Sequence, residues 1–392
     1  MRIAYFSDNS YPELSGIVDS ILITGKELVA RGHEVVFVGP RYSPANYAKA
    51  KRALMLKDGH EVIDGLRIIR IPSLPLPFSP TGQSRFSFPF GSSFSFLDSW
   101  KPDIIHTQSP YGTGFEALRA ARRYKVPLIG TNHTPIEEFY PWAPELMRNF
   151  DAWYYNHCDF ITAPYANLLK NMREKGFKKP AQVMANPISL PLYNPASSEE
   201  KGGQKNKLGL TGPVILYCGR LSVEKRVRQV IEGLATLMGE FPDLTFIATG
   251  HGSEKANLEA LSKKLGMEKN VLFTDFVATE VLPSYYRAAD VFALMSTSDS
   301  QSLALMQAFA SGIPAVGARS RGLPDYLPPT CGYLVEPGDS KAFAERVREL
   351  LLNPVLREQM GKAGVEFVKQ FSPQKIAAEW EEIYQHYGKN SD

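Results

Sequence analysis

The chain has 392 residues, of which 44% are hydrophobic and 22% charged, a composition typical of globular domains and not of disordered or fibrous chains. The formal net charge is only +3, but residues 1–190 carry a net +5 and residues 191–392 a net −2. The length predicts two domains, and the basic half is the one we expect to face an anionic partner.

The apolar run at the N-terminus is too short for a signal peptide, and no uninterrupted apolar stretch reaches membrane-spanning length. The three cysteines, Cys158, Cys218 and Cys331, form no C-x-x-C pair, so the sequence suggests neither a disulfide framework nor a zinc site. We therefore expect a reducing, cytoplasmic location.

Short apolar runs alternate with amphipathic helical stretches, a pattern typical of parallel-sheet α/β domains. In the first half, Gly32 is expected to end a helix at 17–31 before a strand at 34–38. The other strands expected in this half lie at 2–7, 66–71, 103–106, 127–131 and 159–162.

A second α/β series begins near residue 213. Its expected strands are 213–218, 244–249, 271–273, 290–294, 314–316 and 333–335, and its expected helices lie near 224–240, 253–265, 280–288, 301–311 and 341–352. Between the two series, the segment 187–212 is rich in Pro, Ser, Gly and Lys and is predicted to be a linker.

Residues 72–97 are rich in Pro, Ser and Phe, which predicts an exposed loop that packs on something and not a core strand. A final helix near 372–388 begins with Pro at an early position, and we expect it to cross back onto the N-terminal domain. The predicted domains are therefore 1–188 together with 372–392, and 205–371.

The most informative segment is G-R-L-S-V-E-K at 219–225, which follows an apolar strand and precedes a helix. It places the cations of Arg220 and Lys225 where a helix N-terminus already offers free N–H groups and a partial positive charge. This combination suits a diphosphate, although a solvated basic helix start is the alternative.

Glycines at the ends of two strands are candidates for close approach by a phosphate or sugar. Gly16 opens the first helix after a loop, and Gly250 and Gly252 flank His251 at the end of a strand. Ligands of open α/β sheets bind at these strand ends. An ordinary helix start at Gly16 and a tight turn at Gly250 remain equally good interpretations.

Asp299 and Gln307 lie eight residues apart, which carries the chain from a polar loop down two turns of a helix that starts near Gln301. The N–H groups of Ser300 to Leu303 would be free at that helix start. Capping of the helix and a solvated helix face are the structural alternatives.

His133 follows the apolar strand at 127–131, again at a strand's carboxyl end, where a structural role is the alternative to a catalytic one. The sequence has no D-x-D motif, the usual ligand for the metal of metal-dependent sugar transferases. Arg220 and Lys225 could neutralise a leaving diphosphate instead.

Taken in order, these segments resemble the retaining glycosyltransferases of family 4, which have the GT-B fold of two Rossmann-like domains. The resemblance spans nearly the whole chain and includes S-G-I-V-D-S-I, R-G-H-E-V, P-D-I-I-H-T-Q-S-P, G-T-N-H-T, G-R-L-S-V-E-K, G-H-G, A-F-A-S-G-I-P-A-V and L-V-E-P-G-D. The segments at 15–21 and 70–78 are similar to lipid-directed members, such as diacylglycerol glucosyltransferases and phosphatidylinositol mannosyltransferases.

The resemblance implies roles by position: Arg220 and Lys225 on the donor diphosphate, His133 and Asp299 on the donor sugar, and Gln307 on the ribose. The implied catalytic residues are His133, Asp299, Arg220 and Lys225. The implied donor-binding residues are Gly16, Arg220, Lys225, Gly250, Gly252, Phe276, Ser300, Gln301, Ser302, Leu303 and Gln307. No metal and no cofactor are expected; the UDP- or GDP-linked sugar is a substrate.

The sequence departs from the family pattern at three of these positions. Asp299 stands for the first Glu of an E-x7-E pattern, Gln307 for the second, and Ser302 for a usual Gly. Loss of the charge at Gln307 would weaken a hydrogen bond to ribose by on the order of 1 kcal/mol. These changes could retune donor choice or mark a poorly active copy.

We therefore predict a metal-independent, retaining transfer of a hexose from a nucleotide diphosphate to a membrane-lipid hydroxyl, by an enzyme that is cytoplasmic or peripheral at the inner membrane face. Two basic clusters of the first domain could contact anionic lipid or be plain solvated faces. They are Lys170, Arg173, Lys175, Lys178 and Lys179, and Arg119, Arg122, Arg123 and Lys125. The alternatives are a soluble-acceptor transferase, a catalytically weak sugar-nucleotide or partner-binding protein, and an epimerase; no nucleic-acid partner is expected.

Overall fold

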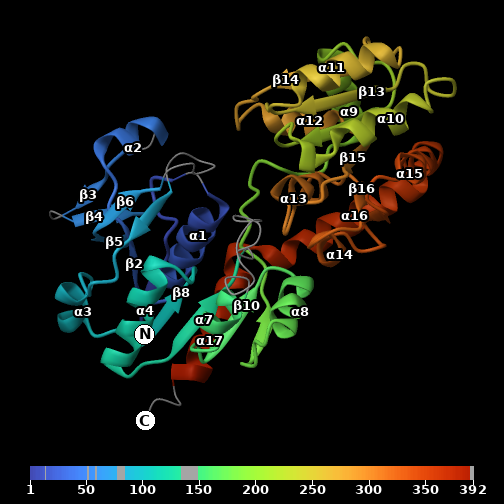
Figure 1. The fold of residues 1–392 in the computed structure, drawn as a ribbon. Helices are drawn as coiled ribbons and strands as arrows, with labels where there is room; N and C mark the ends of the chain where they lie inside the picture. The colour runs from blue at the N-terminus through green and yellow to red at the C-terminus, as the bar shows by residue number, and fades with distance from the viewer. Residues whose placement is uncertain (14, 51–52, 58–59, 77–83, 134–148, 389–392) are drawn as a thin grey trace. The chain divides into compact units, whose positions relative to one another are not determined.

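The structure is a computed structural model that describes residues 1–388 except 14, 51–52, 58–59, 77–83 and 134–148. The chain divides into two compact units (Figure 1). The first unit comprises Met1–Pro187 and Phe371–Asp392, and the second comprises Ile188–Gln370.

The first unit is built on a nine-stranded sheet in the order β11-β10-β9-β8-β1-β2-β5-β4-β3. All neighbouring pairs are parallel except β5-β4 and β4-β3, which form an antiparallel edge. A separate hairpin joins β6 to β7. The strands are β1 (Arg2–Phe6), β2 (Glu34–Pro40), β3 (Leu56–Lys57), β4 (His60–Ile63), β5 (Leu66–Ile71), β6 (Ser73–Pro75), β7 (Arg85–Ser87), β8 (Ile104–Thr107), β9 (Leu128–Thr131), β10 (Phe160–Ala163) and β11 (Ala181–Val183).

The helices described in the first unit are α1 (Gly16–Ala30), α2 (Pro44–Ala50), α3 (Phe94–Trp100), α4 (Gly112–Tyr124), α7 (Phe150–Tyr155), α8 (Ala166–Glu174) and α17 (Pro373–Gly388). Helix α17 buries an apolar stripe that includes Ile376, Trp380 and Tyr384, spaced one helical turn apart. This stripe joins the main hydrophobic core beneath β1 and α1. The segment at the end of the sequence is therefore an integral part of the first unit.

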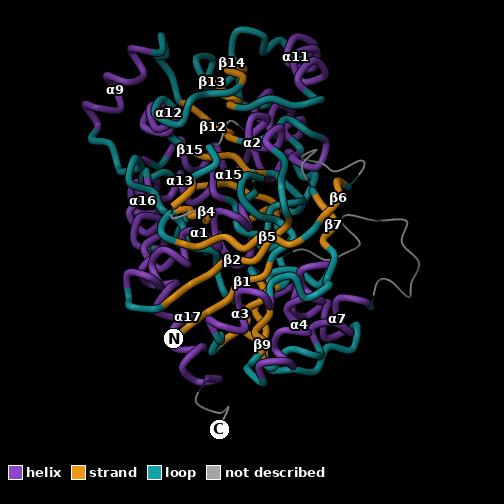
Figure 2. The backbone as a smooth tube through the Cα atoms, turned by 90° about the vertical axis from the view of Figure 1, so that its left-hand side faces the viewer, coloured by secondary structure: helices purple, strands orange, loops and turns teal. Residues whose placement is uncertain are grey.

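The second unit has a six-stranded, all-parallel sheet in the order β14-β13-β12-β15-β16-β17. Figure 2 labels β14, β13, β12 and β15 of this sheet. Its strands are β12 (Val214–Cys218), β13 (Thr245–Thr249), β14 (Val271–Asp275), β15 (Val291–Leu294), β16 (Ala315–Ala318) and β17 (Gly332–Val335). The central strands β12, β15 and β16 are continuous apolar runs because helices cover both faces of the sheet. Both units confirm the predicted α/β class with parallel sheets.

The helices of the second unit are α9 (Ser198–Lys207), η1 (Val223–Lys225), α10 (Val227–Ala235), α11 (Lys255–Lys264), α12 (Leu282–Ala288), α13 (Leu303–Ala310), α14 (Leu323–Tyr326), α15 (Ser340–Leu352) and α16 (Pro354–Val368), and η2 (Lys369–Phe371) follows at the boundary of the units. Here η denotes a 3₁₀ turn. Helix α16 was not expected from the sequence.

The segment predicted as a linker, 187–212, contains a helix, α9, that was not expected from the sequence. Ser197 caps this helix by accepting a hydrogen bond from the Glu200 amide, and the Glu200 carboxylate accepts one from the Ser197 amide, which completes a capping box. Two lysines then fix the helix to the sheet, because Lys201 and Lys205 both pair with Asp290 at the start of β15. The helix buries none of its residues, so no apolar pattern revealed it.

The segment 72–97 is also more ordered than expected, because it holds the β6–β7 hairpin and the start of α3, although residues 77–83 lie outside the described chain. The helix expected at 224–240 is interrupted. Val223–Lys225 form a 3₁₀ turn, Arg226 adopts a left-handed conformation with φ 52°, and α10 begins only at Val227.

Candidate active site

The strand order of each unit reverses once, and the predicted site residues cluster at these reversals. In the second unit the chain runs outward from β12 through β13 to β14, and in the opposite direction from β15 through β16 to β17. Ligands of open α/β sheets bind beyond the carboxyl ends of the strands at such a switch point. Arg220 and Lys225 follow β12, and Asp299 follows β15, so the structure places the three on the two sides of the reversal.

The turn after β12 presents Arg220 and Lys225 differently. The Arg220 side chain is 73% exposed and lies 3.7 Å from Glu224, four residues later. Its backbone carbonyl accepts a 2.7 Å hydrogen bond from the Tyr217 hydroxyl, which fixes the strand end. The backbone of Arg220 is therefore held in place, while its exposed guanidinium group has room to turn towards an anion.

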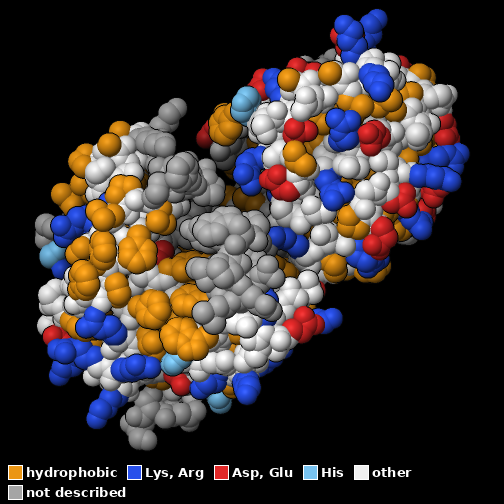
Figure 3. Space-filling model, viewed as in Figure 1, with side chains coloured by type: hydrophobic (Ala, Val, Ile, Leu, Met, Phe, Trp, Pro, Cys, Tyr) orange, Lys and Arg blue, Asp and Glu red, His pale blue; other side chains and the backbone are white. Residues whose placement is uncertain are grey.

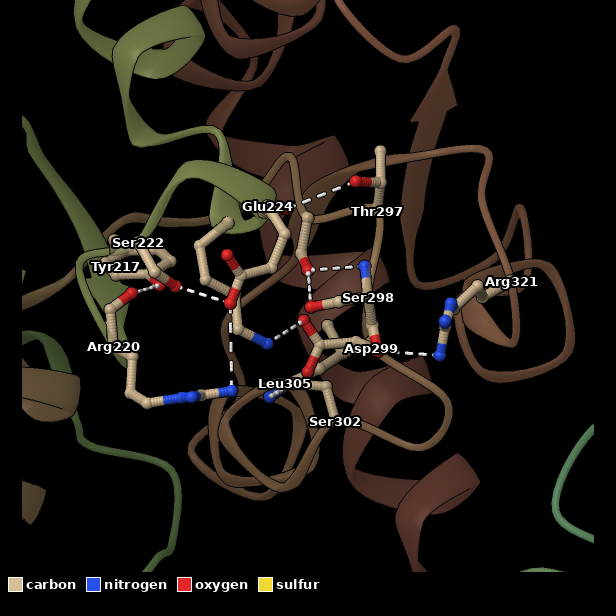
Figure 4. A network of polar contacts seen from close by, with 12 residues as sticks. Tyr217, Arg220, Ser222, Glu224, Thr297, Ser298, Asp299, Ser302, Leu305 and Arg321 are labelled. Atoms are coloured by element: carbon tan, nitrogen blue, oxygen red, sulfur yellow. Dashed lines mark hydrogen bonds and ion pairs between the residues drawn. The ribbon is translucent and has the colours of Figure 1, made fainter. Parts of the chain in front are cut away.

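Lys225 is instead held in place by an ion pair. Its Nζ lies 2.8 Å from Oδ2 of Asp299, and both side chains are largely buried, at 13% and 17% exposure. The two loops are tied together next to this pair, because the Thr297 amide and hydroxyl both donate to the Glu224 carbonyl, at 3.0 and 3.2 Å (Figure 4). The site thus offers a paired cation and anion together with the open cation of Arg220.

The loop that carries Asp299 is braced from a third strand end. Arg321, which follows β16, donates to the Ser298 carbonyl at 3.3 Å (Figure 4). The Gly322 amide donates to the Asp299 carbonyl. Gly322 is required here, since an added Cβ would lie 2.2 Å from the Ser300 carbonyl oxygen. These contacts hold the carboxylate of Asp299 in its place beside Lys225.

Helix α13 begins two residues later than expected. Ser302 is its N-cap, and the Ser302 hydroxyl accepts from the Leu305 amide at 3.4 Å. The serine that replaces the usual glycine therefore serves the helix end. Ser300, Gln301 and Leu303 lie with Ser302 around the positive end of the helix dipole, where negative charge is stabilised.

Gln307 lies one turn further along α13 and is already bound by the protein. Its Oε1 accepts a 2.9 Å hydrogen bond from the buried hydroxyl of Tyr286 on α12. The same hydroxyl also reaches the Ala304 carbonyl at 3.2 Å. Tyr286 occupies one of the two lone pairs of Oε1, so Gln307 can still accept one hydrogen bond there and can donate through its carboxamide N–H groups, whereas a carboxylate could only accept.

Gly250 and Gly252 are needed for packing within the second unit. An added Cβ at Gly250 would lie 2.0 Å from the Gly219 carbonyl oxygen, and one at Gly252 would lie 2.1 Å from that of Leu221. The two glycines therefore let the turn after β13 lie directly against the turn that carries Arg220. Beside them, Phe276 is 84% exposed.

In the first unit the strand order reverses between β1 and β8, and Gly16, Gln108 and His133 follow β1, β8 and the next strand, β9. Gly16 is the first residue of α1, which Ser15 caps, and no described atom lies within 4 Å of the position a Cβ would take. His133 follows β9, and its Nε2 lies 2.6 Å from Oε1 of Gln108. Burial lowers the pKa of His133 to about 4, so the ring is neutral at pH 7.

The sequence reasoning assigned no role to His106 and Gln108. His106 is fully buried in β8, where burial, aided by the charge of His133, lowers its pKa well below the ordinary value. Gln108 bridges the two imidazoles. Together with Thr131 and Trp380, Gln108 and His133 line a small cavity of the first unit. The polar residues His106, Thr107 and Gln108 at the end of an apolar strand are the sequence signal that could have indicated this part of the site.

Within the described residues no cluster of His, Cys, Asp and Glu could hold a metal ion.

The fold defines the class of protein. The structure is similar to that of Anabaena HepE in complex with UDP, with a TM-score of 0.76 at 18% sequence identity, over 98% of this chain and 100% of that one. This is the GT-B fold expected from the sequence.

The sequence then gives the family. Residues 14–191 match the model of Glycosyltransferase Family 4, and residues 198–367 match that of Glycosyl transferases group 1. The chain belongs to the glycosyltransferases of family 4, and it is an enzyme of the sugar-transferring class.

Two named relatives are similar along most of the chain. An alpha-monoglucosyldiacylglycerol synthase of Streptococcus pneumoniae is 26% identical over 328 residues, 81% of this chain and 70% of the relative. A GDP-mannose-dependent alpha-mannosyltransferase of Corynebacterium glutamicum is 26% identical over 401 residues, 99% of this chain and 88% of the relative.

Proposed function

We propose that the chain transfers a hexose from a nucleoside diphosphate sugar, UDP- or GDP-linked, to a hydroxyl of a membrane lipid, with retention of configuration and without a metal. The observation that carries this proposal is the pairing of Lys225 with Asp299 at the switch point of the second unit, with Arg220 exposed in the same turn as Lys225. The exposed guanidinium of Arg220 and the ion-paired ammonium of Lys225 provide one cation for each phosphate of a diphosphate. Asp299 and His133 would contact the donor sugar, and Gln307 the ribose.

In the proposed reaction the bond between the sugar C1 and the diphosphate oxygen breaks, and a bond forms between C1 and the acceptor oxygen. The acceptor proton passes to the departing phosphate oxygen on the same face of the sugar. Arg220, Lys225 and the N-terminus of α13 stabilise the charge that develops on the diphosphate. These groups would supply the stabilisation that a metal ion supplies in other sugar transferases.

The retaining outcome is supported by the name of the Corynebacterium relative. GDP-mannose carries an α-linked mannose, so an alpha-mannosyltransferase that uses it keeps the configuration. The lipid acceptor is supported by the name of the Streptococcus relative, a diacylglycerol glycoside synthase. No described helix is long and apolar enough to cross a bilayer.

A surface of the first unit fits such a contact. We call it the aromatic face and define it by the exposed rings of Phe86 and Phe90, with Leu74 and Leu76 of the hairpin region. Phe86, Phe88 and Phe90 form a row with ring centroids 5.4 and 5.5 Å apart. Figure 3 shows hydrophobic side chains gathered on this unit, with Lys and Arg along their lower margin.

Arginines of α4 lie beside this face. Arg119 donates to the Pro89 carbonyl, next to Phe90, and lies over the ring of Phe94 with Arg123. Exposed rings beside cations are the combination that binds an anionic bilayer at its interface. We place the enzyme on this ground as a peripheral protein of the cytoplasmic membrane face.

The test measures transfer from UDP- and GDP-hexoses to diacylglycerol in vesicles, in EDTA, by wild type and by Lys225→Ala and Arg220→Ala. Removing one group that stabilises the leaving charge is expected to lower kcat by about 10²- to 10³-fold. Arg228→Ala is the matched control, because Arg228 forms the same i,i+4 pair with Glu232, at 3.8 Å, on the next helix. It should keep full activity.

Equal rates in wild type and both site variants would contradict the diphosphate site. Activity that is lost in EDTA and restored by a divalent cation would contradict metal independence. Transfer to a soluble sugar but not to vesicles would replace the lipid acceptor by a soluble one.

A further inference from the structure

Five side chains of the first unit form an unbroken row of hydrogen bonds that ends at His133, and we call this row the polar relay. Tyr5 Oη lies 2.7 Å from Tyr384 Oη, which lies 2.7 Å from Nδ1 of His106. Nε2 of His106 lies 3.0 Å from Nε2 of Gln108, and Oε1 of Gln108 lies 2.6 Å from Nε2 of His133. The relay joins β1, β8 and α17.

Every member of the relay is neutral at pH 7. Tyr5, His106 and Tyr384 are buried to 1% exposure or less. Burial lowers the pKa of both histidines and raises that of both tyrosines. Each imidazole therefore has one N–H and one lone pair, and each hydroxyl has one proton to donate.

The carboxamide of Gln108 sets the direction of all these bonds. Its NH₂ group faces His106, so Nε2 of His106 is the acceptor of this hydrogen bond. The proton of the neutral His106 ring therefore lies on Nδ1, which donates to the Tyr384 oxygen. Tyr384 in turn donates to Tyr5, which lines the small cavity together with Gln108 and can turn its own proton towards that cavity. At the other end the Gln108 oxygen accepts, so the proton of His133 lies on Nε2.

The reverse arrangement is also complete, because turning the carboxamide by half a rotation reverses every bond of the relay together. Nε2 of His106 then carries the proton, Tyr384 donates to Nδ1 of His106, and the proton of His133 moves to Nδ1. Thr131, whose Oγ1 lies 2.8 Å from Nε2 of His106, fits either arrangement, because its hydroxyl can donate or accept.

We propose that Gln108 is a positioning residue that sets the tautomer of His133, and that the hydroxyl of Tyr384 on α17 selects between the two tautomers. The Tyr384 oxygen is the acceptor that keeps the His106 proton on Nδ1. Without that oxygen, the Nδ1–H group of His106 would have no acceptor in the first arrangement. In the reverse arrangement only the Nδ1 lone pair of His106 would face the place that the oxygen had occupied. An unpaired buried donor is the costlier of the two.

The consequence for catalysis rests on the proposed function, in which His133 contacts the donor sugar. With its proton on Nε2, the ring offers the Nδ1 lone pair, which accepts a hydrogen bond from a sugar hydroxyl. With its proton on Nδ1, the ring can only donate there. If Nδ1 of His133 carries a proton where the sugar hydroxyl also donates, the hydrogen bond is lost, and kcat/KM falls by about 5- to 150-fold.

The test is the side-chain ¹⁵N spectrum of ¹⁵N-histidine-labelled full-length protein at pH 7.5, without donor. The signals of His133 are identified by their loss in His133→Asn. We expect the Nε2–H tautomer in wild type and the Nδ1–H tautomer in Tyr384→Phe. Tyr155→Phe is the matched control, because it removes an equally buried hydroxyl that donates to the Thr131 carbonyl, outside the relay. It should leave the tautomer unchanged.

A second variant tests the direction of the hydrogen bonds independently of the single Tyr384→Phe variant. The oxygens of Gln108→Glu can only accept, so the double variant Gln108→Glu/Tyr384→Phe should return the His133 proton to Nε2. A wild-type tautomer in folded Tyr384→Phe, or an Nδ1–H tautomer in the double variant, would overturn the relay. A changed tautomer with unchanged sugar transfer would support the relay and contradict the proposed role of His133.

Discussion

The Nζ atom of Lys225 lies 2.8 Å from Oδ2 of Asp299, although the two residues are 74 positions apart in the sequence. The pair links the ends of β12 and β15, the strands on either side of the switch point of the second unit. The Lys225 charge is thus partly neutralised before a donor binds. A diphosphate must share this cation with the carboxylate or displace it.

The first prediction concerns this competition. Asp299→Asn keeps the shape of the side chain and removes the charge, so Lys225 becomes fully available to phosphate. We expect the affinity for the free nucleoside diphosphate to rise about two- to tenfold, the effect of one unit charge at a partly solvated site. Hexose transfer should fall, because the carboxylate proposed to contact the donor sugar is gone.

Isothermal titration with UDP and GDP gives the affinities, and steady-state transfer gives the rates. Glu232→Gln, which removes a carboxylate paired with Arg228 on α10, should change neither. A lower affinity for the diphosphate in Asp299→Asn would argue that the carboxylate orients Lys225 and does not compete for it.

The second prediction compares two glycines. Gly16→Ala adds a Cβ where no described atom lies within 4 Å, so the protein itself should tolerate the change or gain up to about 1 kcal/mol. Gly252→Ala would place its Cβ 2.1 Å from the Leu221 carbonyl oxygen and should lower the stability of the second unit by about 1–3 kcal/mol.

Thermal unfolding and donor titration separate the two effects. If a phosphate approaches Gly16, Gly16→Ala should weaken donor binding in a protein of normal stability. Unchanged donor binding in Gly16→Ala would reduce this glycine to an ordinary helix start.

The third prediction is a pH dependence of stability. The pKa of His133 is about 4 in the folded chain, against an ordinary value of 6.5, because burial disfavours the charged ring. Between these values the unfolded chain binds the proton and the folded chain does not. Stability is therefore complete above pH 6.5 and falls as the pH drops towards 4, by up to about 1.4 kcal/mol per pH unit for this residue. His106, whose pKa is also lowered, acts in the same direction.

Calorimetry of the first unit's transition at pH 7.5 and 5.0 measures this loss. His133→Asn should make the decrease shallower, whereas His251→Asn, a change at an exposed histidine of the second unit, should leave it as in wild type. Identical decreases in wild type and His133→Asn would show that His133 is not a neutral buried group.

The fourth prediction concerns the aromatic face. Phe86→Ser with Phe90→Ser removes two rings that are 44% and 73% exposed, so folding should be little affected. Binding to vesicles that contain anionic lipid should fall, since each ring contributes apolar area at the bilayer interface. Co-sedimentation with vesicles measures it.

Leu352→Ser with Val355→Ser is the control, because these side chains are exposed to a similar degree on the second unit. Equal loss of binding in both double variants would mean that exposed apolar area in general, and not this face, binds the bilayer.

Much of the fold was accessible from the sequence because strands buried on both faces, such as β12 and β15, are unbroken apolar runs. Arg220, Lys225 and Asp299 could be chosen because each follows such a strand. Their pairing could not be predicted, since it depends on which strands are neighbours in the sheet. The same holds for the bond between His106 and Tyr384, which are 278 residues apart. Helix α9 was missed because its stability comes from a capping box and two lysines rather than from apolar spacing.

The first unit is assembled from two separated stretches of chain, whereas Ile188–Gln370 is continuous. During synthesis the ribosome releases Ile376, Trp380 and Tyr384 only after the whole second unit has emerged. Until then the nascent first unit lacks one wall of its core, so the unit that is translated later is the one that can finish folding earlier. A fragment that stops near residue 187 should accordingly need a chaperone, or the α17 peptide added in trans, to stay out of aggregates.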